Sequence, residues 1–365
     1  MQTVIKSIAT SNPPLRRSQE YASSFMQRIT SIPQPIRSRI PQIYERSGID
    51  FRFSCLEDYG REAEDFEFYP ANWELSPQPS TSERNVLYRE AVIPLTERAA
   101  SEALENSGVD RSEITHLIAV SCTGFFAPGL DIELVRRLGF PADTRRTFIG
   151  FMGCYAAFNA MRVAHGFCQS HPDARVLLVC AELCTLHFQV NGSFESAIVN
   201  AIFSDGAAAA VLAGVPDEEA AGELMYIEGQ TALDADSMED MTWDIGDTGF
   251  VMGLSSRVPT VIADRLPSFL DGLLSPYELA VRDIDFWAIH PGGRAIIDKA
   301  QEVLDLTDAA VHDSLEVLRL HGNMSSPTIL FVLKRILDRK ETVGTGVALA
   351  FGPGLTIEGA LLGRV

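Results

Sequence analysis

The chain has 365 residues, 46% of them apolar, which is enough to bury one large core or two medium ones. Its formal net charge of −19 argues against nonspecific attraction to nucleic acid or to an anionic membrane. The N-terminus lacks the basic-then-apolar pattern of a signal peptide, and no apolar run approaches the roughly 18 residues of a membrane span.

The first hundred residues begin with a strand and end in a long helix. VIKSIAT, residues 4–10, is typical of a strand, and a helix is expected around 20–29. Residues 57–85 are acidic and rich in turn formers, so we interpret them as a surface excursion. Apolar residues recur at helical spacing over 86–106, which predicts a helix that ends near Gly108.

Strands and helices alternate over the next hundred residues. ITHLIAVSC, residues 114–122, is typical of a buried strand, and Gly139 closes a helix expected at 130–140. The elements expected after it are the strand TFIGF, a helix after Cys154, a strand at 174–183, a helix near 195–202 and a strand at 206–214. This alternation predicts a layered α/β fold.

The second half of the chain repeats this alternation of strands and helices less regularly. We expect strands at 224–231, 285–290 and 346–352, and helices near 258–274, 293–304 and 325–339. Each half contains a strand that leads into a reactive residue, Cys154 in the first and His290 in the second. We therefore predict two related halves, residues 1–217 and 218–365, with a site between them.

Six cysteines are present, and several lie in apolar runs such as VLLVCAEL. That pattern fits reduced thiols in a cytoplasmic protein better than a disulfide framework. Cys154 differs because it follows GFMG and precedes a run with an apolar helix face. At a helix start, unpaired N–H groups and the helix dipole should lower the pKa of the thiol. Taken alone, a buried structural cysteine would be the commoner explanation.

His290 and Asn323 also stand at the ends of predicted buried elements. His290 ends an apolar strand, and Gly292 and Gly293 after it permit close approach of a backbone or ligand before a helix starts. Asn323 lies in a turn before an apolar helix, where it could equally be an N-cap. Together, a thiol, an imidazole and an amide can form carbon–carbon bonds on thioesters. The thiolate carries the acyl chain, and the other two donate to an oxygen that becomes negative.

Two other kinds of site use some of the same residues. Cys180, Cys184 and His187 form a C-x3-C-x2-H pattern, although no second pair with zinc-like spacing accompanies it. A papain-type hydrolase would use a cysteine and a histidine, together with a path for water to the acyl-enzyme.

The segments GFMGCYAAFNAMR, AIFSDGAAA, AIHPGGRAIID, HGNMSSPTILFVL and AFGPGLTIE resemble, in this order and spacing, the type III polyketide synthases. These are the chalcone synthase-like enzymes, here of bacterial type, with the αβαβα layers of the thiolase fold. The resemblance implies that Cys154 takes a starter acyl group from coenzyme A and that His290 keeps this thiol ionised. His290 and Asn323 would stabilise the enolate formed when malonyl-CoA loses CO2. Phe203 matches a gatekeeper ring that disfavours the malonyl carboxylate.

The resemblance also implies the substrate sites. Coenzyme A thioesters are the expected substrates, with no permanently bound cofactor and no metal. Arg39 and Arg46 match two of three basic residues that bind coenzyme A phosphates in plant relatives, Gln42 replaces the third, and Gly292 and Gly293 are assigned to the same site. The residues expected to line the acyl cavity are Cys122, Cys184, Leu186, His187, Trp243, Met252 and Ser325. Plant enzymes usually have threonine in place of Cys122 and chalcone synthase has glycine in place of Trp243, so a coumaroyl starter is not expected.

We therefore expect decarboxylative condensation of an acyl starter with malonyl-CoA, followed by closure to a pyrone, a resorcinol or a related ring. Apolar cavity residues favour a fatty acyl starter, delivered by coenzyme A or by an acyl carrier protein. A homodimer is expected through the segment CTGFFAPGL, with Ala127 at its tip, unless Phe125 and Phe126 pack only within their own subunit. The alternatives are a 3-oxoacyl-carrier-protein synthase III and a catalytically silent partner protein of the same fold. Neither a nucleic acid nor a membrane is an expected partner.

Overall fold

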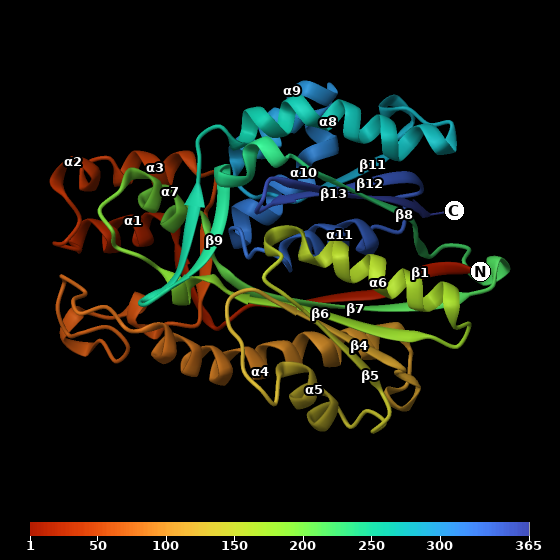
Figure 1. Ribbon diagram of the computed structural model, residues 1–365, viewed down its shortest axis with the longest axis horizontal. Coiled ribbons are helices and arrows are strands. Elements are labelled where there is room, and N and C mark those ends of the chain that lie inside the picture. The colour runs from red at the N-terminus through yellow and green to blue at the C-terminus, as the bar shows by residue number, and fades with distance from the viewer. Residues whose placement is uncertain (365) are drawn as a thin grey trace.

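The computed structural model describes residues 1–364 (Figure 1). The strands are β1 (Gln2–Ser11), β2 (Leu15–Ser18), β3 (Phe51–Ser54), β4 (His116–Ser121), β5 (Arg145–Gly150), β6 (Arg175–Leu183), β7 (Asp205–Val215), β8 (Leu224–Leu233), β9 (Met241–Gly246), β10 (Gly249–Leu254), β11 (Phe286–Ile289), β12 (Gly344–Gly352) and β13 (Thr356–Arg364). The α-helices are α1 (Gln19–Arg28), α2 (Gln34–Arg37), α3 (Ile40–Arg46), α4 (Thr81–Ser107), α5 (Leu130–Leu138), α6 (Ala156–Ser170), α7 (Phe194–Ile202), α8 (Val258–Leu274), α9 (Arg294–Leu304), α10 (Asp308–His321) and α11 (Thr328–Asp338).

The main sheet shows that the two halves of the chain follow the same path. Its strand order is β11-β12-β13-β8-β1-β7-β6-β4-β5. In the first half, β1 is antiparallel to β7, β7 is antiparallel to β6, and β6 is parallel to β4. In the second half, β8 is antiparallel to β13, β13 is antiparallel to β12, and β12 is parallel to β11. The halves join where β1 pairs with β8. The expectation that the fold consists of two related halves is confirmed.

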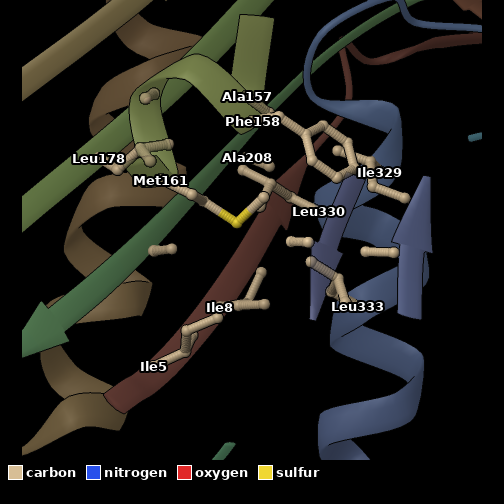
Figure 2. Close-up of a cluster of buried hydrophobic side chains, with 14 of the residues drawn as sticks. Ile5, Ile8, Ala157, Phe158, Met161, Leu178, Ala208, Ile329, Leu330 and Leu333 are labelled. Atoms are coloured by element: carbon tan, nitrogen blue, oxygen red, sulfur yellow. The ribbon is translucent and has the colours of Figure 1, made fainter. Parts of the chain in front are cut away.

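The helices form layers around the two halves of this sheet. In Figure 1, α4 and α5 cover one outer face, α8, α9 and α10 cover the other, and α6 and α11 lie in between. Figure 2 shows how the central layer packs: Phe158 and Met161 of α6 meet Leu330 and Leu333 of α11 beside Ile8 of β1, and all five are almost fully buried. The apolar residues of both helices recur three and four positions apart, which places them on one face. The layering is the αβαβα arrangement of the thiolase fold.

Most predicted elements are present, with shifted ends. α8 has the predicted bounds, and α5 ends at Gly139, which has a positive φ of 70°. α4 begins at Thr81, five residues before the predicted start. The Ser80 hydroxyl accepts from the Glu83 N–H and the Glu83 carboxylate accepts from the Ser80 N–H, so a capping box starts this helix.

The interpretation of residues 57–85 as a surface excursion is wrong for much of the segment. Phe66, Tyr69 and Leu75 are buried in the core that includes α1. The buried Asp58 carboxylate accepts three backbone N–H bonds, including that of Tyr69 at 2.8 Å. The aromatic residues follow no helical or strand period, so only their contacts with distant residues show that they are core.

Several elements were not predicted, among them α10, β13 and the β9–β10 hairpin. β13 contains Glu358, which is buried and bonded to Arg162 at 2.8 Å, and two glycines interrupt its apolar pattern. Within residues 1–364, no helix is long and apolar enough to cross a lipid bilayer.

Candidate active site

Cys154 lies beyond the end of β5, in a single 3-10 turn (Gly153–Tyr155) that leads into α6. The backbone approaching it is constrained, because Phe151 has a positive φ of 59° and Gly153 one of 80°. A Cβ atom at Gly153 would lie 2.5 Å from Cδ of Pro353, in the turn between β12 and β13. A non-glycine residue in the left-handed region costs on the order of 1–3 kcal/mol and is typical of functional sites.

Burial sets the protonation state of the thiol and the imidazole. The expected lowering of the Cys154 pKa is wrong: burial raises it to about 11, outweighing hydrogen bonds from Ser325 and Asn323 that favour the thiolate. Burial also lowers the pKa of His290 to about 3. Removing the thiolate charge from water raises the pKa of the thiol more than the N–H groups and dipole of a helix start lower it. Burial therefore favours the neutral thiol and the neutral imidazole, in contrast to the expected ion pair.

His290 follows β11 and is 1% exposed, and both of its ring nitrogens are buried without a hydrogen-bond partner among residues 1–364. Buried polar atoms are nearly always bonded, so an imidazole left open on both sides indicates a functional role.

Asn323 is held rigidly between the two halves. Its Nδ2 donates to the Gly292 carbonyl at 3.1 Å, and its Oδ1 accepts from the Ser325 N–H at 2.8 Å. It is not the N-cap of α11, because Pro327 occupies that position. The Asn323 backbone also pairs with the end of α7, through bonds to Ile202 and Ser204 on either side of Phe203. The predicted gatekeeper ring and the predicted oxyanion donor are thus fixed relative to each other.

One cavity brings together most of the predicted substrate residues. It holds about 1230 Å³ of empty space, the open mouth included. Cys154 and Phe203 line it together with Cys122, Cys184, His187, Trp243, Met252 and Ser325. Leu186 does not line it and is corrected to a core residue, because it is fully buried and its carbonyl accepts from Arg84.

His187 and Trp243 hold the β9–β10 hairpin against the segment that follows β4. Trp243 Nε1 donates to the Cys122 carbonyl at 2.8 Å. His187 Nε2 donates to the Thr123 carbonyl at 2.7 Å, and its Nδ1 accepts from the Phe250 N–H at 3.0 Å. Because both ring nitrogens are used, His187 cannot transfer protons or bind a metal without losing these bonds. Cys180, the first residue of the zinc-like pattern, is packed in the hydrophobic core, whereas Cys184 and His187 line the cavity.

Glu182, at the end of β6, was missed by the sequence reasoning. Its fully buried carboxylate accepts from the hydroxyls of Thr123 at 2.7 Å and Ser326 at 2.6 Å, and from the Cys122 N–H at 2.9 Å. Burial raises the pKa of this carboxyl. A carboxylate inside the apolar run VLLVCAEL was the signal that could have revealed it, because a buried acid needs dedicated donors.

The residues predicted to bind coenzyme A lie outside the cavity lining. Arg39 and Arg46 stand at the two ends of α3 with exposed side chains, and Gly293 caps α9. Gly292 and Gly293 meet other side chains only at 3.6 Å or more from a built Cβ, so the fold does not need glycine there for its own packing. Sequence reasoning also missed the cavity residues contributed by β2, β3 and α1.

Known proteins share this architecture across the whole chain. The N-terminal domain of chalcone and stilbene synthases matches residues 2–216, and the C-terminal domain matches residues 226–365. A crystal structure of PKS-I from the brown alga Ectocarpus siliculosus superposes with a TM-score of 0.95 at 36% identity, covering 100% of this chain and 98% of that one. The C-terminal type III polyketide synthase domain of Steely1 from Dictyostelium gives 0.90 at 26% identity, with 100% of both chains covered.

Curated relatives agree. Pks18 of Mycobacterium tuberculosis, described as an alpha-pyrone synthesis polyketide synthase-like protein, is 30% identical over 98% of this chain and 90% of its own length. Polyketide synthase 37 of Dictyostelium discoideum is 33% identical over 99% of this chain, which spans only 12% of that larger protein. The chain belongs to the chalcone and stilbene synthase family, the type III polyketide synthases.

Proposed function

We propose that this type III polyketide synthase carries its growing acyl chain on Cys154, with His290 and Asn323 as the groups that act on the thioester oxygen. The observation that carries this proposal is the buried imidazole of His290 with both nitrogens unpartnered among residues 1–364. A neutral imidazole offers one acceptor nitrogen and one N–H donor, which are the two functions that the reaction needs.

Acylation begins from the neutral pair. The Cys154 thiol gives its proton to His290 while the sulfur attacks the carbonyl carbon of the starter thioester. The new carbon–sulfur bond displaces coenzyme A as a thiolate, which takes the proton from the imidazolium. His290 returns to its neutral form, which burial favours.

Extension uses the same groups as donors. When malonyl-CoA loses CO2, the electron pair of the broken carbon–carbon bond moves onto the thioester as an enolate. The His290 N–H and the second N–H of Asn323 Nδ2 donate to the enolate oxygen. The enolate carbon then attacks the acyl carbon on Cys154, and the Cys154 thiolate leaves. Phe203 provides an apolar surface that favours loss of the carboxylate.

An aliphatic starter and closure to a pyrone, a resorcinol or a related ring are part of this proposal. The cavity lining includes Phe25, Met26, Tyr59, Phe188 and Val199. Such a surface suits a medium or long alkyl chain, delivered by coenzyme A or by an acyl carrier protein in the cytoplasm. Arg39 and Arg46 on α3 are the proposed contacts for the coenzyme A phosphates.

A homodimer is proposed through the edge strand β5 and the segment after β4. Phe148 on β5 is 40% exposed, and its ring lies 6.0 Å from that of Phe125. Phe126 instead lies 6.3 Å from Tyr88 of its own subunit. Exposed apolar side chains such as Phe148 favour a contact that covers them, so light scattering at micromolar concentration should give a mass near two chains of 40.0 kDa. A mass near one chain would contradict the dimer.

Purified protein incubated with malonyl-CoA and a series of acyl-CoAs tests the function. We expect CO2 release, extended products by mass spectrometry and an acyl adduct on Cys154. A catalytically silent protein would release no CO2. A 3-oxoacyl-carrier-protein synthase III would stop after one extension and require a carrier protein for the malonyl group.

A further inference from the structure

The β2–β3 wall of the cavity, made by Leu15 and Arg17 of β2 and Arg52 and Ser54 of β3, carries two cations side by side. In this antiparallel pair Leu15 is opposite Ser54 and Arg17 is opposite Arg52. Cross-strand partners point to the same face of a ribbon. All four residues line the cavity that also contains Cys154. An acyl chain held on the thiol therefore shares one space with both guanidinium groups.

Both guanidinium groups donate to neutral acceptors. Arg52 donates to Gln19 Oε1 at 2.8 Å and to the Phe203 carbonyl at 2.9 Å, both neutral acceptors. Arg17 donates from Nη1 to the Arg16 carbonyl at 3.2 Å, while its Nε is buried and has no partner in residues 1–364. Within those residues neither guanidinium forms an ion pair. Like charges directly opposite in a ribbon repel, so an anion here would relieve a cost that the free protein carries.

The Arg17 side chain packs closely against Gly60. A Cβ atom built on Gly60 would lie 2.1 Å from Arg17 Nη2 and 3.0 Å from its Cζ. The guanidinium therefore occupies space that exists because residue 60 has no side chain. The Tyr21 ring lies 5.2 Å from Arg17 Cζ on another side. In residues 1–364 the Arg17 Nε and Nη2 groups have no protein acceptor, and an edge of a guanidinium that is left unbonded can pair with a carboxylate.

The surroundings indicate which anion fits. Phe25, Met26 and Tyr59 line the same cavity, so the group that reaches Arg17 should be attached to an apolar chain. Tyr21 is 38% exposed, so a charged end there can remain partly hydrated. Resting on the proposed function, we infer that Arg17 binds the terminal carboxylate of a starter acyl chain, so that the enzyme takes ω-carboxyacyl thioesters. Arg52 supplies the second positive charge but stays bonded to the gatekeeper backbone.

The test compares two starters of equal length, octanoyl-CoA and its ω-carboxy counterpart suberoyl-CoA, with malonyl-CoA as extender. We expect Arg17→Met to lower kcat/KM for suberoyl-CoA roughly 10- to 100-fold, the range for a charge-assisted contact. Octanoyl-CoA should be used as well as before or better, which also shows that the variant folds. Gly60→Ala keeps the charge but displaces the guanidinium, so it should give the same selective loss. Arg17→Lys should retain part of the preference.

Equal losses for both starters in Arg17→Met would overturn the inference, because Arg17 would then act on the shared coenzyme A or on malonyl-CoA. Binding to Cys154→Ala protein, measured by calorimetry, separates the inference from the proposed function. Tighter binding of suberoyl-CoA than of octanoyl-CoA, lost in the double variant with Arg17→Met, supports the carboxylate contact even if no condensation occurs. Equal affinities for the two thioesters would refute it, whether or not condensation proceeds.

Discussion

The thiol end of the cavity and its β2–β3 wall are built in opposite ways. Cys154, His290 and Asn323 stand where elements of the two repeated halves meet, and burial shifts the pKa values of Cys154 and His290 toward their neutral forms. Arg17 and Arg52 come from a ribbon outside the main sheet and are charged without an ion-pair partner among residues 1–364. The reacting groups therefore depend on the layered core, whereas the proposed choice of substrate depends on segments added around it.

The largest effect is expected for Cys154→Ala. Without the nucleophile no acyl chain is attached, so polyketide formation should fall below detection. Intact-mass and peptide mass spectrometry should find the starter on Cys154 in the wild type. Cys184→Ala is the matched control, because Cys184 lines the same cavity and should change only product distribution. Normal polyketide synthesis by Cys154→Ala would place the nucleophile elsewhere.

Asn323→Ala should lower the rate of CO2 release from malonyl-CoA by roughly 10²- to 10³-fold, the usual cost of one oxyanion donor. Acylation of Cys154 should be affected less, because decarboxylation needs the enolate to be stabilised. Ser326→Ala, which removes a hydroxyl bonded to Glu182, is a control for general disturbance of this segment. Unchanged CO2 release in Asn323→Ala would reduce Asn323 to a structural link between the halves.

Trp243→Gly should enlarge the cavity and shift products toward longer starters or more extensions. The ratio of these longer products to the wild-type products should rise roughly tenfold or more. The indole lines the cavity and is fixed by its bond to the Cys122 carbonyl. Trp243→Phe keeps most of the volume but removes the N–H donor, so it separates the filling of space from the clamping of the hairpin. An unchanged product spectrum in Trp243→Gly at normal activity would place this side chain outside the part of the cavity that substrate uses.

A pH dependence of stability is also expected. Burial lowers the pKa of His290 to about 3, whereas in the unfolded chain this imidazole binds a proton below its ordinary value of 6.5. Its contribution is therefore fully present above pH 6.5 and is lost as pH falls toward 3, about 2 kcal/mol of it by pH 5. Urea unfolding at pH 7.5 and 5 should show a larger loss for the wild type than for His290→Gln.

That comparison between variants removes the contributions of other buried groups, which remain the same in both proteins. Burial lowers the pKa of His187 to about 4, which acts in the same direction as His290. The Asp205 carboxyl has a pKa raised by burial to about 6, so it acts in the opposite direction. Parallel pH profiles for the wild type and His290→Gln would show that His290 does not stay neutral in the folded protein.

The reactive residues that lie within short motifs could be identified from the sequence alone. Cys154, His290 and Asn323 each sit in a motif of contiguous residues, and the strand or helix beside each motif has a clear apolar pattern. The layered fold followed from the same alternation, because backbone period and burial agree locally. Phe203 and the cavity residues were instead named from the family resemblance, and Leu186 is the exception because adjacent residues of a 3-10 turn point in different directions.

The pKa shifts of Cys154 and His290 and the composition of the cavity wall depend on how distant segments pack together. The helix-start argument for Cys154 considered only local dipoles, whereas burial by both halves controls its pKa. Arg17 and Gly60 are far apart in the sequence and have no periodic pattern, yet one guanidinium fits where the other residue lacks a side chain. Contacts of this kind depend on how separate segments meet in space, and neither composition nor spacing along the chain records that meeting.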